Sequence, residues 1–346
     1  MRVVRVPVRM RVSKGVIMPS FGWMATGLVR AHDVVSLHLP QFDAAGVALR
    51  GRLLGRPTTL TYHCDLSLPP GPLNRVVDVA VDVMNRLAAL WAYRIVAYTE
   101  DFANHSPFLL RHARKVEIIP PPVEVPAVSA EAVAAFRARH GLDGRTTVIG
   151  MAARLATEKG VEVLLSALPR VLAERPDTRV LFAGQHERVL GEEAYARRLA
   201  PLFARHGERW RFLGVLSPEE MTAFFCSLDV IVVPSLNSTE SFGLVQVEAM
   251  LCGTPSIASA LPGVRQPVLQ TAMGEVVPVG DSERLADAIL RVVRRRADYV
   301  KPRAEIERRF STARTIDGYE ALFECLLQTS AIAGRAPMDG RDDDGR

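Results

Sequence analysis

The sequence has little lysine, few aromatic residues and no long apolar run, and the last two absences each exclude a class of protein. Only four of its 43 basic residues are Lys, so Arg carries almost all of the positive charge. With 6% aromatic residues and a net charge of +5, it shows no basic and aromatic stripe of the kind that binds nucleic acid. No apolar segment reaches the ~20 residues that a membrane-spanning helix needs. The 346 residues, 48% of them hydrophobic, instead predict a soluble globular protein.

Cysteine is also scarce, and the motifs of several enzyme classes are missing. The four cysteines lie far apart without a C-x-x-C pair, which predicts reduced thiols in the cytoplasm (Cys64, Cys226, Cys252 and Cys325). The sequence has no G-x-S-x-G, H-E-x-x-H or Walker motif and no metal-ligand cluster, so it predicts no metal and no cofactor. Residues 1–11 alternate Arg with Val and lack the apolar core of a signal peptide. Their Arg side chains fit either peripheral contact with an anionic inner membrane face or a solvated strand edge.

What the sequence does contain is a repeated alternation of short apolar strands with helices. A first series of strands is predicted at residues 33–38, 57–62, 94–98 and 115–119, and a second at 147–150, 180–183, 210–213, 229–233, 256–258 and 275–278. Such alternation favours parallel sheets that helices cover on both faces. Pro120-Pro121-Pro122 interrupts the alternation, so we expect a domain boundary there.

This organisation predicts an α/β fold with two Rossmann-like domains. The first domain is predicted at residues 1–122, a connector with one short helix from Ala130 to His140 at 123–145, and the second domain at 146–312. A terminal amphipathic helix at 313–330 and a disordered tail at 331–346 follow. Two such domains on a short connector are expected to face each other across a cleft, with ligands at the carboxyl ends of the strands.

Two carboxylates follow the predicted strand at 229–233. The strand, a polar turn and a helix from Phe242 to Leu251 place free N–H groups and the positive end of a helix dipole at the rim of the second sheet. Glu240 and Glu248 have seven residues between them, which corresponds to at most ~12 Å if the interval is helical. That is about the length of a sugar diphosphate, whose hydroxyls at both ends suit carboxylates. Two solvated surface carboxylates on an ordinary strand–turn–helix unit explain the same pattern.

A second loop carries two cations. Arg154 and Lys159 lie between the strand at 147–150 and a helix that begins at Gly160. A guanidinium fork and a mobile ammonium can hold a diphosphate from two sides. Lys is unfavourable at a helix N-terminus unless an anion binds there, so its position favours a phosphate site. The alternative is that Glu158 and Lys159 are only solvated side chains at the start of a helix.

Three residues at predicted strand ends are weaker candidates. Gly263, in the loop after the strand at 256–258, allows close approach of the backbone to a ligand but is equally common in a plain turn. His63 ends a strand of the first domain, where it can donate a hydrogen bond into the cleft or act as an acid or base. A lone His at a strand end is more often structural, and His38 has the same ambiguity in weaker surroundings.

Together these features resemble the retaining glycosyltransferases of family 4, which have the GT-B fold. The resemblance runs from about residue 33 to 325, in the order and spacing of Ala153-Arg154, Glu158-Lys159-Gly160, Glu240-Ser241-Phe242-Gly243, Glu248-Ala249-Met250 and Gly253-Thr254-Pro255.

The resemblance implies a role for most of the candidate residues. Arg154 and Lys159 would hold the diphosphate of a nucleotide sugar, and Glu248 the ribose hydroxyls. Glu240 would hold the transferred sugar. His63 matches the position of a family His near that sugar, and the terminal helix would brace the first domain. The implied catalytic residues are Glu240, Lys159, Arg154 and His63, and the implied donor-binding residues are Glu248, Ser241, Phe242, Gly243, Leu244 and Gly263.

The chain departs from the family pattern at its start. Such enzymes normally open with a hydrophobic strand, a Gly-rich loop and a helix, which are not visible here, so the N-terminal domain is expected to be incomplete. Ala153 stands where Gly is usual, and Gly184-Gln185-His186-Glu187 stands where a Gly-rich turn is usual. The donor half is therefore expected to be complete and the acceptor half shortened.

The sequence thus predicts retaining transfer of a hexose from a UDP- or GDP-linked sugar to a hydroxyl acceptor, which is a glycan or is lipid-linked. No side chain is a convincing covalent nucleophile, so front-face displacement is favoured, and two cations make a metal unnecessary. One alternative is a non-catalytic nucleotide-sugar-binding or partner protein derived from such an enzyme. Another is a nucleotide-sugar epimerase, which would need further acid and base residues.

Overall fold

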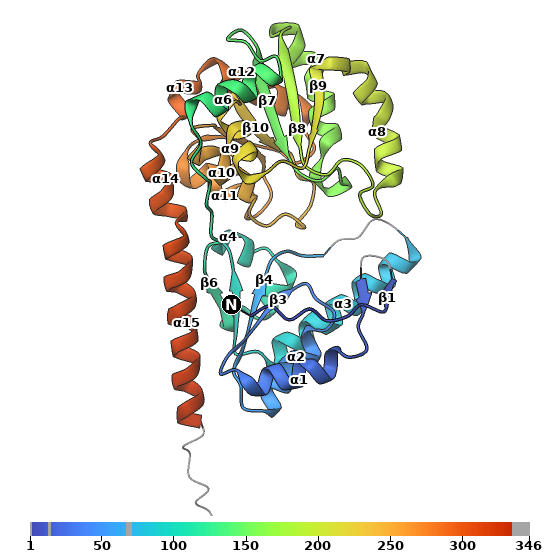
Figure 1. The fold of residues 1–346 in the computed structure, drawn as a ribbon, viewed down its shortest axis with the longest axis vertical. Coiled ribbons are helices and arrows are strands. Elements are labelled where there is room, and N and C mark those ends of the chain that lie inside the picture. Colours follow the sequence, from blue (N-terminus) through green and yellow to red (C-terminus); the bar gives the residue numbers. More distant parts are fainter. Residues whose placement is uncertain (1, 13–14, 67–70, 334–346) are drawn as a thin grey trace, which may run out of the picture.

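The chain folds into two lobes stacked along the long axis of the molecule (Figure 1). The computed structural model describes residues 2–12, 15–66 and 71–333. The chain passes between the lobes after β6 (Val116–Ile118) and again between α14 (Arg303–Phe310) and α15 (Thr312–Ala333). Each lobe has its own parallel sheet, so the α/β fold with two Rossmann-like sheets is confirmed.

The N-terminal lobe is built on a four-stranded parallel sheet in the order β3-β4-β5-β6. Before β6 its strands are β3 (Val35–Leu39), β4 (Thr58–Tyr62) and β5 (Arg94–Ala97). Its helices are α1 (Phe21–Ala31), α2 (Ala44–Leu53), α3 (Pro72–Trp91), α4 (Glu100–Ala103), α5 (Pro107–Arg111) and the 3-10 helix η1 (Ala113–Lys115). A separate antiparallel hairpin joins β1 (Met10–Val12) and β2 (Gly15–Ile17).

The C-terminal lobe is built on a six-stranded parallel sheet in the order β12-β11-β10-β7-β8-β9. Its strands are β7 (Thr147–Ala152), β8 (Thr178–Ala183), β9 (Trp210–Gly214), β10 (Val230–Val233), β11 (Ser256–Ser259) and β12 (Gly274–Val277). Its helices are α6 (Ala130–Arg139), η2 (Thr157–Lys159), α7 (Val161–Glu174), α8 (Glu193–His206), η3 (Gly207–Arg209), α9 (Pro218–Cys226), α10 (Leu244–Leu251), α11 (Gln266–Thr271), α12 (Ser282–Arg294), α13 (Arg296–Tyr299) and α14. The strand order reverses between β7 and β10, and ligands of open α/β sheets bind at such switch points.

Alternate residues of the central strands face two different helix layers. Ile149 and Met151 of β7 are buried in the cluster that contains α7, α8 and α12, whereas Val148 is buried in the cluster with α6, α9 and α10. Successive side chains of a strand point to opposite faces of the sheet. This two-sided burial is why the central strands β7 and β10 are almost wholly apolar in sequence.

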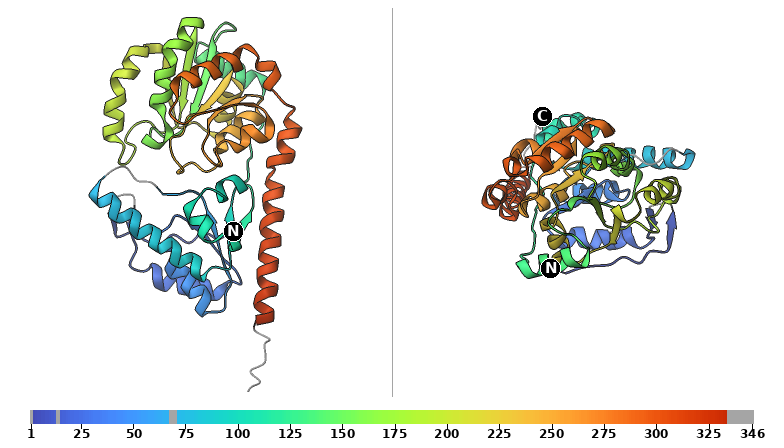
Figure 2. Two further views of the ribbon diagram at one scale, coloured as in Figure 1. Left: turned by 180° about the vertical axis from the view of Figure 1, so that it is seen from behind. Right: turned by 90° about the horizontal axis from the view of Figure 1, so that it is seen from above.

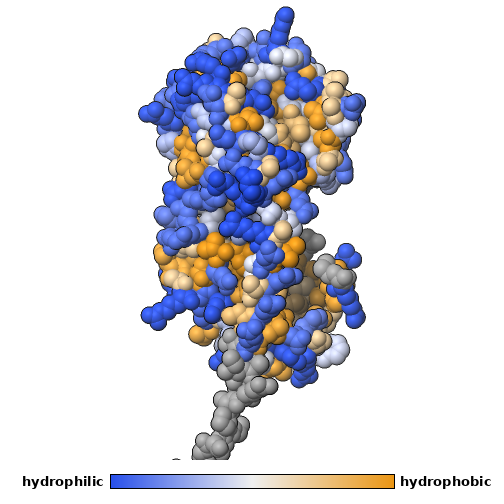
Figure 3. Space-filling view, turned by 90° about the vertical axis from the view of Figure 1, so that its left-hand side faces the viewer, coloured by the Kyte–Doolittle hydropathy of each residue, from blue (hydrophilic) through white to orange (hydrophobic). Residues whose placement is uncertain are grey.

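Helix α15 leaves the C-terminal lobe and lies along the N-terminal lobe, as the two opposite views show (Figures 1 and 2). Leu322 and Leu326 are buried against Val96 and Ile119, and the Tyr319 hydroxyl forms a hydrogen bond of 2.7 Å with Thr61 Oγ1. On the face seen in Figure 3, hydrophobic side chains gather over the lower lobe, and the band between the lobes is mostly hydrophilic. Within the described ranges, each helix is too short or too polar to cross a lipid bilayer.

Three details differ from the sequence-based expectations. The helix assigned to the connector, α6, packs on the C-terminal lobe, because Phe136 is buried there with Phe224. Helix α10 begins at Leu244 and not at Phe242, because Gly243 adopts a left-handed conformation with φ +76°. Of the predicted tail at 331–346, the first three residues end α15, and 334–346 lie outside the described residues.

Candidate active site between the lobes

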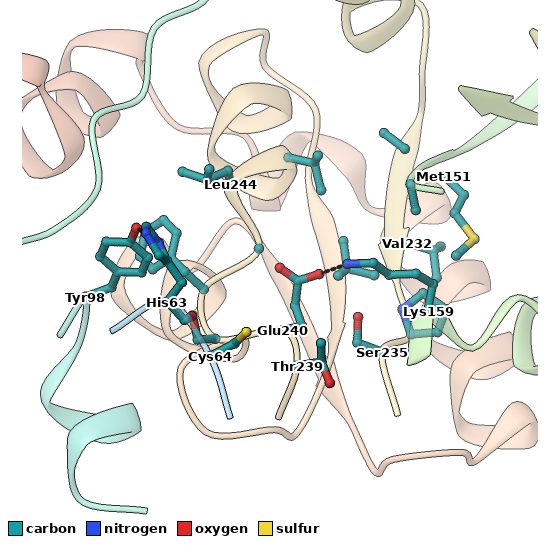
Figure 4. A pocket seen from close by; sticks show the side chains of 18 residues that line it. His63, Cys64, Tyr98, Met151, Lys159, Val232, Ser235, Thr239, Glu240 and Leu244 are labelled. Atoms are coloured by element: carbon teal, nitrogen blue, oxygen red, sulfur yellow. Dashed lines mark hydrogen bonds and ion pairs between the residues drawn. The ribbon is translucent and has the colours of Figure 1, made fainter. Parts of the chain in front are cut away.

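A cavity of about 330 Å³ lies between the lobes, at the carboxyl ends of β7 and β10 (Figure 4). It therefore occupies the switch point of the C-terminal sheet, where a ligand is expected. Most of the predicted site lines it, namely His63, Lys159, Glu240, Ser241, Phe242, Gly243 and Leu244. Residues that were not predicted line it too, among them Cys64, Tyr98, Ser235 and Thr239.

Lys159 and Glu240 meet in this cavity. Lys159 Nζ donates a hydrogen bond to Glu240 Oε2 in an ion pair, and each side chain is only 20% exposed (Figure 4). Lys159 ends η2 after β7, and Glu240 lies 81 residues later in the loop after β10. Because β7 and β10 are paired in parallel, their two loops open at the same edge of the sheet. One cation and one carboxylate predicted from separate motifs thus share a site.

Gly160 allows these two loops to approach. It adopts a left-handed conformation with φ +66° between η2 and α7, and a Cβ built on it would lie 2.0 Å from the Pro234 carbonyl oxygen. Next to this contact, the Leu236 N–H donates a hydrogen bond of 2.9 Å to the Glu158 carbonyl. Glycine is the residue that tolerates both the positive φ and the close backbone contact, so it fixes the position of Lys159.

We expect Gly160→Ala to lower the free energy of unfolding by about 2 kcal/mol or more, because Ala is strained at positive φ and its Cβ would collide with Pro234. Urea unfolding measures the change. Gly144→Ala is the matched control: a Cβ there meets nothing within 4 Å, and the expected change is within about 0.5 kcal/mol. Equal stability of the two variants would contradict the role of Gly160.

His63 lies on the opposite wall of the cavity, in a chain of three side chains. Its Nε2 is 2.8 Å from His38 Nδ1, and its Nδ1 is hydrogen-bonded to the Tyr98 hydroxyl. Burial, and then the charge of His38, lower the pKa of His63, whereas burial raises the pKa of Tyr98. Tyr98 therefore keeps its proton, and its O–H can donate a hydrogen bond to Nδ1 of a neutral His63. In that tautomer, the Nε2–H of His63 donates a hydrogen bond to His38 Nδ1.

The lowered pKa of His63 makes stability depend on pH. Between the lowered folded pKa and the unfolded value of about 6.5, the unfolded chain binds more protons than the folded chain. The free energy of unfolding therefore falls as the pH drops below about 6.5. We expect His63→Gln to reduce this fall by at most about 1.4 kcal/mol per pH unit, in urea unfolding between about pH 5 and about pH 7.5. An unchanged slope would mean that the His63 proton is not coupled to folding.

A comparison with protein families identifies the family of this chain. Residues 133–309 match the family model described as glycosyl transferases group 1. The match spans just over half of the 346 residues and includes both Lys159 and Glu240. The chain belongs to the group 1 glycosyl transferases.

Curated relatives support the same assignment, and solved structures show the fold. This group 1 glycosyl transferase is 29% identical over 329 residues to the D-inositol 3-phosphate glycosyltransferase of Segniliparus rotundus, a match that covers 89% of this chain and 70% of the relative. It is 31% identical over 294 residues to the phosphatidyl-myo-inositol mannosyltransferase of Mycobacterium leprae, covering 83% and 71%. Anabaena Alr3699/HepE, crystallised with UDP and glucose, has a TM-score of 0.70 at 21% identity, covering 93% of this chain and 84% of that one. Sucrose-phosphate synthase from Thermosynechococcus elongatus has a TM-score of 0.62 at 22% identity, covering 92% and 79%. The family and the GT-B fold indicated by the sequence motifs are thereby confirmed.

Two side chains of this group 1 glycosyl transferase that were predicted to bind the donor lie outside the cavity lining. The Arg154 side chain is 54% exposed and forms an ion pair of 3.3 Å with Glu158 of the same loop. Glu248 lies on α10 and is half-buried, and this burial raises the pKa of its carboxyl group. Local pairing holds Arg154 away from the cavity, an effect that the spacing of the motif does not reveal.

The backbone of Gly263 was predicted to lie close to a ligand, but it lies close to the backbone of Ser241 and does not line the cavity. A Cβ on Gly263 would lie 2.0 Å from the Ser241 carbonyl oxygen, and its N–H donates a hydrogen bond of 2.9 Å to Asp101 of the N-terminal lobe. Arg265 also pairs with Asp101, at 2.5 Å. Burial alone would raise the pKa of Asp101, but the hydrogen bonds from Arg265 and Gly263 hold it at about 2. Gly263 thus helps to join the lobes beside the site.

The buried loop after Glu240 also joins the lobes. Ser241 and Phe242 are buried, and Ser241 Oγ donates a hydrogen bond to the His63 carbonyl oxygen. The Ser241 hydroxyl is therefore occupied by the N-terminal lobe. The Leu244 and Val245 backbone begins α10 beside the cavity, where the first N–H groups of a helix lack intrahelical acceptors.

Tyr98 is the lining residue that the sequence offered the best chance of finding. It directly follows β5, as His63 directly follows β4, so the rule that selected His63 also selects Tyr98. Cys64 adjoins His63, and burial raises the pKa of its thiol to about 11, so the thiol is protonated at neutral pH. Thr239 carried no sequence signal beyond its place beside Glu240.

Proposed function

We propose that this glycosyltransferase moves a hexose from a nucleoside diphosphate sugar to a hydroxyl acceptor with retention of configuration. The observation that carries the proposal is the meeting of Lys159 and Glu240 in the cavity at the switch point of the C-terminal sheet. An ammonium suits the diphosphate, and a carboxylate suits the hydroxyls of the sugar. The relatives are called glycosyltransferase and mannosyltransferase, which supports a hexose.

Donor binding would separate the ion pair. Lys159 Nζ would turn from Glu240 to a phosphate oxygen, and Glu240 would then accept hydrogen bonds from the sugar. Thr239 Oγ1, which lines the same cavity, has no hydrogen-bond partner within the described part of the chain. A buried hydroxyl without a partner costs about 1–3 kcal/mol, so a ligand that supplies a partner is favoured. The N–H groups at the start of α10 add donors for an anion.

The proposed reaction is a front-face displacement. The acceptor oxygen forms a bond to the anomeric carbon while the bond from that carbon to the diphosphate oxygen breaks. The acceptor proton passes to the leaving diphosphate, whose growing negative charge Lys159 stabilises. Arg154 would join Lys159 if it left Glu158, and the two cations would then balance the phosphates without a metal. His63 would contact the transferred sugar from the opposite wall, held in place by Tyr98 and His38.

Calorimetry with UDP- and GDP-linked sugars, paired with a transfer assay that determines the anomeric configuration of the product, tests this function. Binding followed by transfer with retained configuration supports it, and an inverted product contradicts the mechanism. Binding without transfer would instead favour a non-catalytic nucleotide-sugar-binding protein. For the acceptor we propose a hydroxyl group of a glycan or of a lipid-linked compound, and for the location of the enzyme the cytoplasm or the inner membrane face.

A further inference from the structure

A second cavity, of about 350 Å³, lies beside the first one and is rich in acidic groups. We call it the α3 cavity, because four residues of α3 line it. Its polar lining consists of Tyr62, Asp65, Asp78, Asp82, Asn85, Arg111 and Ser238. Three carboxylates face one guanidinium there, so the lining carries an excess of negative charge.

Asp78, Asp82 and Asn85 lie at positions i, i+4 and i+7 of α3, and therefore on one face of that helix. Asn85 is only 4% exposed, and its side-chain oxygen Oδ1 has no hydrogen-bond partner within the described residues. The same holds for Oδ1 of Asp78. Two hydrogen-bond acceptors on one wall of the cavity thus lack donors.

The remaining carboxylates are already paired. Asp65 Oδ1 accepts hydrogen bonds from the Tyr62 hydroxyl at 2.9 Å and from Ser106 Oγ at 2.6 Å. Asp82 forms an ion pair of 2.5 Å with Arg86, one turn along α3. A buried acceptor without a donor costs about 1–3 kcal/mol, and more when it is charged. The missing donors are therefore those for Asp78 and Asn85.

The α3 cavity shares a wall with the proposed donor site. His63 and Cys64 line the first cavity and the next residues, Asp65 and Leu66, line the second. On the other lobe, Ser238 lines the second cavity and the next residues, Thr239 and Glu240, line the first. The Asp65 N–H closes this wall with a hydrogen bond of 3.3 Å to the Ser238 carbonyl. A ligand in the α3 cavity would lie directly beside the transferred sugar.

We propose that the α3 cavity binds the acceptor, and that it selects a polyol that carries an amino group. That this ligand is the acceptor rests on the proposed function, whereas the chemistry of the ligand follows from the residues that line the cavity. An ammonium group provides three donors and a positive charge for Asp78, and neighbouring hydroxyls provide donors for Asn85. Asp65 and Asp82 repel a phosphate from the same space. The phosphate groups in the names of the relatives are thus not expected in this cavity.

Direct binding to the full chain tests the proposal without any nucleotide sugar, so the result is independent of whether the chain transfers a hexose. The probes are D-glucosamine, D-glucose and D-glucose 6-phosphate, titrated by NMR near neutral pH. Charge-assisted hydrogen bonds contribute about 1.5–3 kcal/mol, so glucosamine should bind at least ~10-fold more tightly than glucose, and glucose 6-phosphate most weakly.

Variants locate the site. Asp78→Asn keeps the shape and removes the charge, so it should abolish the preference for glucosamine over glucose. Asn85→Leu should weaken binding of both sugars. Asp298→Asn, on the exposed part of α13, is the matched control and should leave the preference unchanged. If thermal melting shows that Asp78→Asn is unfolded, Asp82→Asn replaces it, because Asp82 is 44% exposed and its loss should also reduce the preference.

The proposal is overturned if glucose 6-phosphate binds most tightly, if Asp78→Asn and Asp82→Asn keep the full preference, or if none of the three probes binds. A chain that binds glucosamine at Asp78 but transfers no sugar would support the cavity and contradict the proposed enzymatic function. The two proposals therefore fail separately.

Discussion

Replacing Lys159 by Ala is expected to reduce the turnover number for sugar transfer by ~10²-fold or more. The ammonium is 20% exposed, so it acts in a partly desolvated place where its charge is weakly screened. Its loss leaves the charge that grows on the departing diphosphate without its nearest cation. It also leaves the Glu240 carboxylate unpaired in the cavity, which opposes binding of the anionic donor. The turnover number under saturating nucleotide sugar measures the first effect, and KM measures the second.

Lys301→Ala is the matched control for this substitution. Lys301 lies between α13 and α14 and does not line the cavity, so its removal changes the net charge by the same amount without touching the site. Turnover of Lys301→Ala should stay within about twofold of wild type, because surface substitutions usually change little. Near-normal turnover of Lys159→Ala would remove Lys159 from the mechanism. Melting curves of both variants separate a loss of chemistry from a loss of folding.

Replacing Glu240 by Gln should lower kcat/KM by ~10- to 100-fold. Gln keeps the size of the side chain but loses the charge, and hydrogen bonds to a charged group contribute about 1.5–3 kcal/mol. The sugar would lose these stronger hydrogen bonds, and Lys159 would lose its partner in the empty site. Because Lys159 is then free for the diphosphate, binding of UDP or GDP without a sugar should not weaken. That split between nucleotide and nucleotide sugar distinguishes a sugar ligand from a residue that only supports the fold.

Glu324→Gln, on an exposed position of α15, provides the comparison for a lost carboxylate outside the site. Its kcat/KM should match wild type. If Glu240→Gln weakens UDP and UDP-sugar equally, Glu240 does not bind the sugar. The double variant with Lys159→Ala adds a further check, since directly paired residues give non-additive effects. Additive losses would mean that the two side chains act independently during the reaction.

The sequence by itself determined the local structure and the chemistry available at each loop. Apolar strands buried on both faces leave a clear pattern, as at Val230–Val233, and turn residues show where the loops begin. The two motifs around Lys159 and Glu240 were therefore predicted with their correct places at the ends of strands. Such patterns are local, because hydrophobic periodicity and turn preferences depend on neighbours in the chain.

The tertiary structure alone decided which of these groups meet. Lys159 contacts Glu240 because β10 crosses back to pair with β7, and that strand order has no local signature. Arg154 turned to Glu158 and Gly263 packed on Ser241, although both lie in loops after strands where ligand-binding residues were predicted. Competition between nearby partners and burial against the other lobe settles such side chains. These energies arise only when distant segments come into contact, so no window of the sequence contains them.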